Sequence, residues 1–374
     1  MTIGIDASRA NRDRKTGTEW YSWHLIEELK KITAPNQRVL LYTGEKLKGD
    51  LLVMPGANWQ ERDLLWPPKY LWTQFRLWWE LLTSPPDVLF IPAHTIPFLP
   101  LRKKTKILAT VHDVGFKRFP ELYKPIQVWY HDLTMRKIRG RADLILTDSQ
   151  FSQREIMEFY GVPPEKIKVI YLGYDQDKYH PLDDLTMVEM KKKLSDKYHI
   201  AGRYLLYVGR LEKKKNIGNI IKALAGVKEK FPEMKLVLAG SAGNEEILIS
   251  ETVKKFKLEQ EVILPGYIDS QDLPALIALA EIFVFPTLYE GFGLPIIEAM
   301  ACGTPVVTSR IDPHQEVAGE AAIFVDPKNS QEIADGINNL LSDSVKRAKI
   351  ISRGLERAKT FTWDKTAKEV FGLF

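Results

Sequence analysis

Two glutamates, Glu290 and Glu298, flank a glycine-rich segment that has the clearest chemical potential in the chain. Gly291 and Gly293 lie between them, and Pro295 stands where a helix tolerates proline best, in its first turn. The free N–H groups and the dipole of a helix N-terminus attract an anion such as phosphate. Carboxylates beside a phosphate suit hydroxyl groups better than more phosphate, so the pattern indicates that the two glutamates hold a sugar.

A buried strand and a helix are the elements that must position this segment. Residues 280–286 form a short apolar run before it, which predicts a buried strand. Residues 298–301 are good helix formers, and Cys302-Gly303 ends them. In this order of strand, glycine loop and helix start, the two glycines let the backbone come close to a ligand.

Charged residues after the strand predicted at 204–208 form a second candidate site. Gly209 gives a turn, and Arg210 and Lys215 follow it before a helix. Arginine offers a planar fork for a diphosphate, whereas lysine offers a point charge. Cations usually avoid helix N-termini because the dipole opposes them, so a bound anion would explain their position. The alternative interpretation is a solvated run of charges at a helix start.

The first half of the chain contributes two further candidates. His112 ends the strand predicted at 106–112, where a neutral imidazole could hydrogen-bond a sugar hydroxyl or support proton transfer. Gly17 follows the first strand and precedes a helix, so it could form a loop against substrate. A structural histidine and an ordinary turn are the alternatives for these two residues.

The length and composition are typical of a globular protein with two domains. The chain has 374 residues, which is long for one core, and 45% of them are hydrophobic. A net charge of +5 mildly favours phosphorylated ligands or an anionic membrane surface, and it is far from a nucleic-acid signature. The single cysteine excludes a disulfide within the chain, which fits a reducing cytoplasm. With no signal peptide or membrane span predicted, we expect a soluble protein or one peripheral to a membrane.

Short apolar strands alternate with amphipathic helices, which predicts an α/β fold with parallel sheets covered on both faces. The pattern occurs twice: a first domain is predicted at 1–172 with the tail 361–374, and a second at 201–360 after a polar linker at 173–200. Ligands bind such sheets at the carboxyl ends of the strands, which predicts a site in the cleft between the domains. The strands are predicted at 2–6, 38–42, 88–92, 106–112, 144–147, 168–171, 204–208, 235–239, 262–264, 282–285, 306–308 and 322–325.

Several other features favour ordinary structural roles. The D-x-D pattern at 175–177 has no glycine loop beside it, so we predict no metal site there, and Cys302 is predicted to lie in the core. No G-x-G-x-x-G follows the first strand, which argues against a dinucleotide-dependent dehydrogenase. The tryptophan-rich segment 64–82 predicts a core helix or, alternatively, a helix in the bilayer interface, with the basic loop 101–106 adding positive charge.

With these residues, the sequence resembles the family 4 glycosyltransferases of the GT-B fold over nearly its whole length. Glu290 and Glu298 are similar to the E-x7-E signature of the family, and Gly209-Arg210 with Lys215 is similar to its Arg/Lys pair. The other similar segments are 110–113, 147–152, 162–167 and 361–363. The resemblance implies two Rossmann-like domains facing each other across a cleft, and a C-terminal helix that crosses back to the first domain.

The resemblance also implies a role for each candidate residue. Glu290 would hold hydroxyls of the donor sugar, Glu298 the nucleotide ribose, and His112 the sugar near the reacting carbon. Arg210 and Lys215 would neutralise the leaving diphosphate. His112, Arg210, Lys215 and Glu290 are thus the predicted catalytic residues. The donor would be bound further by Gly17, Gly209, Tyr267, Ile268, Gly291, Phe292, Gly293 and Leu294.

Enzymes of this family retain the anomeric configuration and need no metal or other cofactor. The resemblance therefore implies a hexosyltransferase of polysaccharide biosynthesis that uses a nucleotide sugar, GDP-mannose first and a UDP-hexose close behind. Its acceptor would be a glycan or a lipid-linked acceptor, which suits a cytoplasmic protein at the inner face of an anionic membrane. The alternatives are a nucleotide-sugar epimerase or hydrolase, and a non-catalytic module that binds phosphosugars or membrane. One departure from the family pattern is Thr16-Gly17-Thr18, which has one glycine where many members have two.

Overall fold

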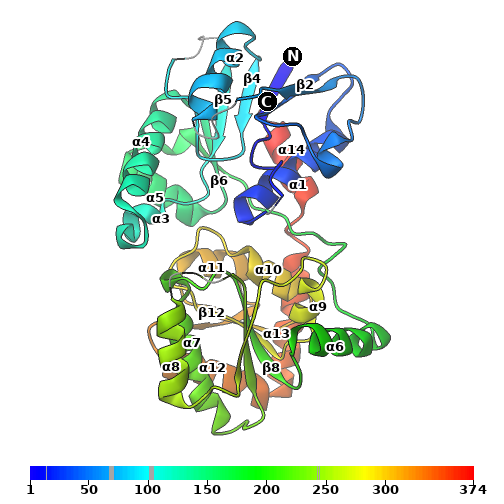
Figure 1. Cartoon of the computed structure of the whole chain (residues 1–374), viewed down its shortest axis with the longest axis vertical. Coiled ribbons are helices and arrows are strands. Elements are labelled where there is room, and N and C mark those ends of the chain that lie inside the picture. The colour runs from blue at the N-terminus through cyan, green and yellow to red at the C-terminus, as the bar shows by residue number, and fades with distance from the viewer. Residues whose placement is uncertain (14, 67–70, 101–104, 242, 244) are drawn as a thin grey trace. The chain divides into compact units, whose positions relative to one another are not determined.

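The computed structural model divides the chain into two compact units (Figure 1). Unit 1 comprises Met1–Gly173 and Trp363–Phe374, and unit 2 comprises Tyr174–Thr362. No helix in the described part of the chain is long and apolar enough to cross a membrane. The structure describes residues 1–13, 15–66, 71–100, 105–241, 243 and 245–374.

Within the described residues, unit 1 is built on a seven-stranded parallel sheet in the order β3-β2-β1-β4-β5-β6-β7. Ligands of open α/β sheets bind where the strand order reverses, which here is between β1 and β4. The strands are β1 Thr2–Asp6, β2 Arg38–Thr43, β3 Trp59–Asp63, β4 Val88–Ile91, β5 Lys106–Thr110, β6 Leu144–Thr147 and β7 Ile167–Val169. The helices and short turns are α1 Gly17–Ile32, η1 Gly49–Leu52, η2 Thr73–Leu77, α2 Trp78–Thr83, α3 Gly115–Arg118, η3 Pro120–Leu122, α4 Pro125–Arg141, α5 Gln150–Tyr160, η4 Pro164–Lys166 and α14 Trp363–Phe371.

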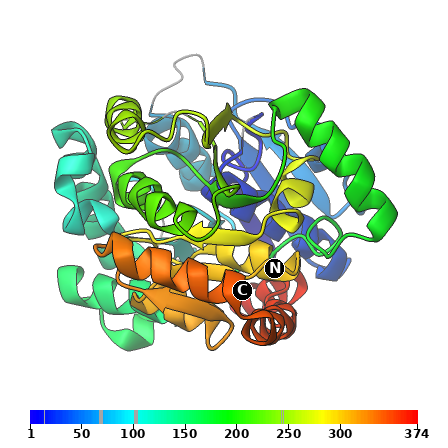
Figure 2. The same cartoon turned by 90° about the horizontal axis from the view of Figure 1, so that it is seen from below.

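Unit 2 has a six-stranded parallel sheet, again among the described residues, in the order β10-β9-β8-β11-β12-β13. Its order reverses between β8 and β11, and Figure 2 shows the strands lying between layers of helices. The strands are β8 Tyr204–Val208, β9 Lys235–Ala239, β10 Val262–Gly266, β11 Ile282–Phe285, β12 Val306–Ser309 and β13 Ala322–Val325. The helices and one short turn are α6 Asp184–Tyr198, η5 Lys213–Lys215, α7 Ile217–Lys228, α8 Glu246–Phe256, α9 Leu273–Ala278, α10 Leu294–Ala301, α11 Asp312–Ala318, α12 Ser330–Ser342 and α13 Ser344–Ala358.

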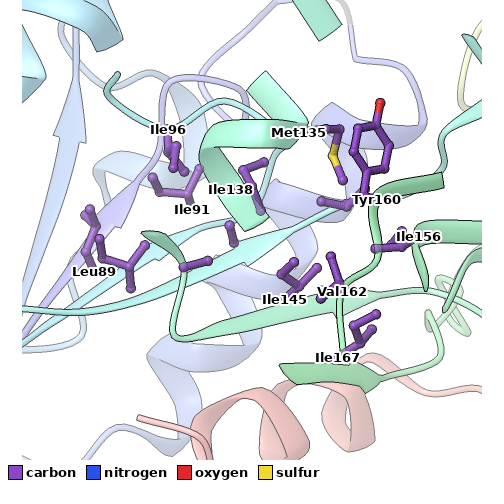
Figure 3. Packing of buried hydrophobic residues seen from close by; sticks show 14 of the residues in the cluster. Leu89, Ile91, Ile96, Met135, Ile138, Ile145, Ile156, Tyr160, Val162 and Ile167 are labelled. Atoms are coloured by element: carbon purple, nitrogen blue, oxygen red, sulfur yellow. The ribbon is translucent and has the colours of Figure 1, made fainter. Parts of the chain in front are cut away.

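An apolar cluster in unit 1 holds the sheet against the helices that cover it (Figure 3). Leu89 and Ile91 of β4 and Ile145 of β6 contribute from the sheet, while Met135 of α4 and Ile156 of α5 contribute from the helices. Full burial of one such side chain contributes roughly 1.5–3 kcal/mol. Because helices cover the sheet, its central strands are continuous apolar runs, and this pattern made them predictable.

The tryptophan-rich segment 64–82 divides between core and surface. Leu81 is buried, whereas Trp79 is 58% exposed, so the core-helix interpretation holds for one side of the segment only. Residues 67–70 of this segment and 101–104 of the basic loop lie outside the described residues.

The C-terminal helix α14 belongs to unit 1, which confirms that the chain returns to its first domain. Thr366 Oγ1 donates a hydrogen bond to the Tyr171 carbonyl at 2.8 Å. The rings of Trp363 and His24 stack with their centroids 5.0 Å apart. Trp363 therefore packs in the first unit.

Residues 174–200 belong to unit 2, although the sequence predicted a linker at 173–200. Helix α6 lies in this stretch, and Lys197 Nζ is 2.7 Å from the buried carboxylate of Asp272. The Tyr198 hydroxyl also donates a hydrogen bond to Asp272, at 2.9 Å. The polar character of the stretch reflects an exposed helix held to its unit by charged contacts.

Candidate functional site

The strand order of unit 2 brings two predicted site segments together. β8 and β11 are neighbours, with Leu205 paired to Ile282, so the loops that follow them lie side by side. Lys215 Nζ in the first loop contacts Glu290 Oε1 in the second. The two side chains are only 14% and 18% exposed, so solvent screens this ion pair less than it screens a surface pair.

Asn216 ties these loops to each other and to a third. Its Nδ2 donates hydrogen bonds to the carbonyls of Pro286 at 2.8 Å and Pro327 at 2.6 Å. The backbone N–H of Leu288 also donates to the Lys214 carbonyl at 2.8 Å. Sequence reasoning missed Asn216, although an asparagine directly before a helix is a signal for a capping position.

Backbones approach each other closely at the carboxyl ends of β8 and β9. Gly240 has a φ of +144°, and a Cβ there would lie 2.0 Å from the Gly209 carbonyl oxygen. The Gly209 N–H donates to the Ala239 carbonyl at 2.9 Å, and the Gly240 N–H donates to the Gly266 carbonyl at 2.8 Å. At the carboxyl ends of β8 and β9 the glycines carry no side chains, so a ligand can come close to the backbone. The sequence analysis identified Gly209 but not Gly240.

Gly293 starts α10 in a conformation that favours glycine. Its φ is +110°, and a Cβ there would lie 3.2 Å from Ile296 Cδ1 and 3.3 Å from His314 Cδ2. The first turn of an α-helix leaves N–H groups without intrahelical partners, and they point toward an incoming anion. The predicted order of strand, glycine loop and helix start is therefore present.

We expect Gly293→Ala to destabilise the protein by about 1–3 kcal/mol, because alanine is strained at this φ. A lower Tm in thermal unfolding would show it, and activity should fall because the start of α10 shifts. Gly218→Ala is the matched control, since Gly218 lies in α7 with no atom within 4 Å of an added Cβ. The control should keep or slightly raise the Tm. Equal Tm values for Gly293→Ala and the native protein would contradict this prediction.

His314 is a buried neutral histidine beneath the same loop. Burial and, to a smaller extent, the positive charge of Lys215 together lower its pKa to about 3. Its Nδ1 lies 2.8 Å from Thr308 Oγ1. The sequence analysis did not identify His314 as a site residue, because its closeness to Gly293 depends on the fold, which no local motif reveals.

Glu298 lies half-buried on α10 with a strongly perturbed carboxyl group. The pKa of Glu298 is raised to about 8, mainly by burial; a hydrogen bond with the Tyr179 hydroxyl opposes this rise, and the charge of Asp175 adds to it. At neutral pH and without ligand, this carboxyl group is therefore mostly protonated. Two residues of the predicted linker 173–200, Asp175 and Tyr179, thus act on one of the two signature glutamates.

The remaining predicted donor residues differ in exposure. Arg210 has a 63% exposed side chain, and its NH1 is 3.1 Å from Glu212 Oε1. Tyr267 is 67% exposed, whereas Ile268 is buried. Phe292 packs its ring edge-on against another aromatic ring of unit 2, so its backbone is the part available to a ligand. Gly291 is buried, and Leu294 is half-buried as the first residue of α10.

In unit 1, His112 forms part of the wall of a cavity of about 150 Å³. His94, Asp113 and His131 line the same cavity, and sequence reasoning identified none of them as candidates. Burial and, to a smaller extent, the neighbouring His131 lower the pKa of His94 to about 3, so this ring is neutral at physiological pH. These residues follow β4 and β5 or lie on α4, and only the fold brings them together.

The predicted first loop is a helix start in which Gly17 is exposed. An added Cβ at Gly17 would meet no atom within 4 Å. Thr16 and Glu19 form a capping box, and the Thr16 N–H donates to Glu19 Oε2 at 3.2 Å. Arg9 NH1 is also 3.2 Å from Glu19 Oε1. Glu19 therefore stabilises the N-terminus of α1 through both Thr16 and Arg9.

Two family models match the chain, one in each half. Residues 16–178 match "Glycosyltransferase Family 4", and residues 190–357 match "Glycosyl transferases group 1". The two matches lie largely in unit 1 and in unit 2, respectively.

Curated relatives include several sugar transferases. O-antigen chain mannosyltransferase B of Escherichia coli is 33% identical over 282 residues, which cover 74% of this chain and 72% of that protein. Serotype-specific mannosyltransferase WbdA of Escherichia coli is 30% identical over 287 residues, covering 74% of this chain and 33% of that protein. Mannosylfructose-phosphate synthase of Agrobacterium fabrum is 29% identical, covering 62% and 52%.

Solved structures resemble the whole chain. HepE of Anabaena in complex with UDP and glucose has a TM-score of 0.75 at 20% identity, covering 100% of this chain and 98% of that one. WaaG, a glycosyltransferase involved in lipopolysaccharide biosynthesis, has a TM-score of 0.75 at 15% identity, covering 100% and 99%. At these identities the likeness shows the fold.

Proposed function

Because the chain belongs to the glycosyltransferases of group 1 and family 4, with the GT-B fold, we propose that it transfers a hexose from a nucleotide diphosphate sugar to an acceptor hydroxyl. The donor is GDP-mannose in the first instance, with a UDP-hexose as the second candidate. The acceptor is a glycan or a lipid-linked acceptor. The transfer retains the anomeric configuration and needs no metal ion.

The ion pair between Lys215 and Glu290 carries this proposal. A cation and a carboxylate in contact can hold the two parts of a donor, since lysine binds phosphate and a carboxylate binds sugar hydroxyls. The pair lies where the strand order reverses, which is the usual binding place in open α/β sheets. Gly293 and the start of α10 follow Glu290 directly and add N–H donors for the phosphate.

The proposed chemistry follows from the charge that develops on the leaving diphosphate. As the bond from the sugar to the phosphate breaks, Lys215 and the α10 N-terminus stabilise the new negative charge. One well-placed donor of this kind contributes roughly 3–4 kcal/mol to the transition state. Arg210 is exposed, so its side chain is free to turn toward the diphosphate. A phosphate oxygen takes the acceptor proton while the acceptor attacks from the same face, which retains the configuration.

The names of two relatives support mannose as the transferred sugar. Both Escherichia coli relatives are called mannosyltransferases. The solved structure of HepE contains UDP and glucose, which keeps a uridine nucleotide as the second candidate. Both donor types present the same diphosphate to Lys215.

A thermal-shift panel tests the donor class. The purified protein would be heated with GDP, UDP, ADP, their mannose and glucose conjugates, and NAD, each in the presence of EDTA. A ligand at 100 times its Kd stabilises the folded state by about 2.7 kcal/mol, which gives a measurable rise in Tm. We expect a rise with GDP and GDP-mannose. No rise with any nucleotide or nucleotide sugar, with or without Mg²⁺, would contradict the proposal and favour a non-catalytic module.

Acceptor dependence separates transfer from the enzymatic alternatives. An epimerase or hydrolase would convert the donor without an acceptor, whereas a transferase would convert it only when an acceptor glycan is added. Product analysis with and without mannose-containing oligosaccharides makes this distinction. Full donor conversion in the absence of acceptor would count against transfer.

A further inference from the structure

We propose that Asp148 is a positioning residue that holds His112 in one orientation, with Nε2 of the ring presented to the donor sugar. The segment 147–152, which resembles the glycosyltransferase family without an assigned role, supplies this support. This inference rests on the proposed function for the identity of its ligand, the donor sugar.

The first support is a short contact between two buried groups. His112 Nδ1 lies 2.6 Å from Asp148 Oδ2, and their side chains are 16% and 5% exposed. The residues follow β5 and β6, which are neighbours in the sheet, with Thr110 paired to Leu146. The distance is that of a charge-assisted hydrogen bond. An ionised carboxylate can only accept a hydrogen bond, so Nδ1 carries the proton when Asp148 is charged.

The second support fixes the backbone of the histidine. Ser152 Oγ donates a hydrogen bond to the His112 carbonyl at 2.9 Å. Ser149 caps α5 by accepting a hydrogen bond from the Ser152 N–H at 3.0 Å. The same short segment therefore holds the His112 ring through Asp148 and the His112 main chain through Ser152.

The third support comes from α1. The rings of Tyr21 and His112 meet edge to face, with centroids 4.8 Å apart and an interplanar angle of 86°. The Tyr21 hydroxyl lies 3.1 Å from Thr110 Oγ1, which fixes the tyrosine in turn. The imidazole is thus restrained by a carboxylate on one ring atom and by an aromatic edge.

Nε2 of His112 is the atom left for a ligand. Nε2 is buried, and among the described residues no partner meets the distance and angle criteria of a hydrogen bond to it. The nearby Pro92 carbonyl nevertheless raises the His112 pKa. A purely structural histidine would pair both ring nitrogens, because a buried polar atom without a partner costs about 1–3 kcal/mol. The ring also lines the unit 1 cavity.

The charge state of His112 depends on the groups around it. Burial lowers its pKa, but the charge and hydrogen bond of Asp148 and the charge of Asp113 outweigh this effect, so the pKa is raised overall. His94 and the Tyr21 hydroxyl also face the ring, and both are neutral at physiological pH. With Nδ1–H held by Asp148, Nε2 accepts a hydrogen bond from a sugar hydroxyl when the ring is neutral and donates one when it is charged.

Asp148→Asn tests the proposal, because the asparagine amide can donate to Nδ1 and so favour the opposite tautomer. We expect kcat to fall on the order of tenfold to a hundredfold, while the Kd for GDP changes less than about twofold. In a His112→Ala background, the same substitution should cost less than about twofold, since Asp148 acts through the histidine. Independent losses that multiply in the double variant would overturn the proposal.

Asp143→Asn is the matched control for a structural role. Asp143 lies at the opposite end of β6, where its Oδ2 accepts a hydrogen bond from the Ile107 N–H at 2.7 Å. Asp143 is exposed, but its variant removes a carboxylate contact between the same two strands, so it should lower the Tm slightly and leave kcat unchanged. A loss of kcat equal to that of Asp148→Asn would mean that both act by destabilising the sheet.

A measurement that needs no turnover separates this proposal from the proposed function. ¹⁵N NMR of histidine-labelled protein reports which ring nitrogen of His112 is protonated. We expect the Nδ1–H tautomer in the native protein and a shift toward Nε2–H in Asp148→Asn. If the neutral ring of His112 in the native protein carries its proton on Nε2, the positioning role is overturned, whatever reaction the enzyme catalyses. Absence of turnover with a correct tautomer would overturn only the proposed function.

Discussion

Lys215→Ala is expected to lower kcat/KM for the nucleotide sugar by at least about a hundredfold, because it removes a cation placed where the leaving diphosphate gains charge. The side chain is only 14% exposed and contacts Glu290, so its charge is held in position before any ligand arrives. The Kd for the free nucleoside diphosphate should rise as well. Steady-state kinetics with GDP-mannose and UDP-glucose would measure the loss.

Two variants separate this effect from damage to the loop. Lys213→Ala removes an exposed cation from the same turn, η5, and should leave kcat/KM within about threefold of the native value. Glu290→Gln removes the negative charge beside Lys215, so it should preserve binding of the free diphosphate while turnover of the sugar donor falls. Near-normal activity of Lys215→Ala would refute the diphosphate role. Arg210→Ala is expected to act in the same direction, although its side chain is exposed in the ligand-free protein.

The sequence predicted the fold and its family because both depend on local patterns. The strand predicted at 282–285 is β11, Ile282–Phe285, and the fold class and the glycosyltransferase family are confirmed. β3 was missed because Trp59–Asp63 is a polar run at the edge of its sheet. An edge strand is exposed along one side, so it lacks the continuous apolar pattern of a central strand.

The contacts within the site depend on strand order, which local patterns do not contain. Lys215 and Glu290 could each be identified from their neighbours, but their contact requires β8 to lie beside β11. Asp148 illustrates the same limit. The sequence analysis identified the segment 147–152 as similar to the family, but the contact of Asp148 with His112, which follows β5, requires β5 to lie beside β6. The roles assigned to the donor-binding residues remain predictions that the variants above would test.

The raised pKa of Glu298 makes nucleotide binding a function of pH. If this carboxylate accepts hydrogen bonds from both ribose hydroxyls, the protonated form must lose its proton before it binds. With a pKa of about 8 in the ligand-free protein, affinity for GDP or UDP should rise with pH by up to about tenfold per unit below pH 7, and level off above pH 8. Isothermal titration at several pH values would measure this rise.

Glu298→Gln supplies the control, because it keeps the shape of the side chain and the titration of the nucleotide phosphate but removes the carboxyl proton. Its affinity should be lower at pH 8 and should lack the part of the pH dependence that Glu298 contributes. Stability gives an independent check. Because the folded pKa lies above the unfolded value of 4.5, the free energy of unfolding of the ligand-free native protein should fall as the pH rises from 4.5 to 8, and this contribution should vanish in Glu298→Gln. Identical pH profiles of nucleotide affinity in the two proteins would exclude Glu298 from the ribose site. The hydrogen bond between Glu298 and Tyr179 would then have only a structural role at α10.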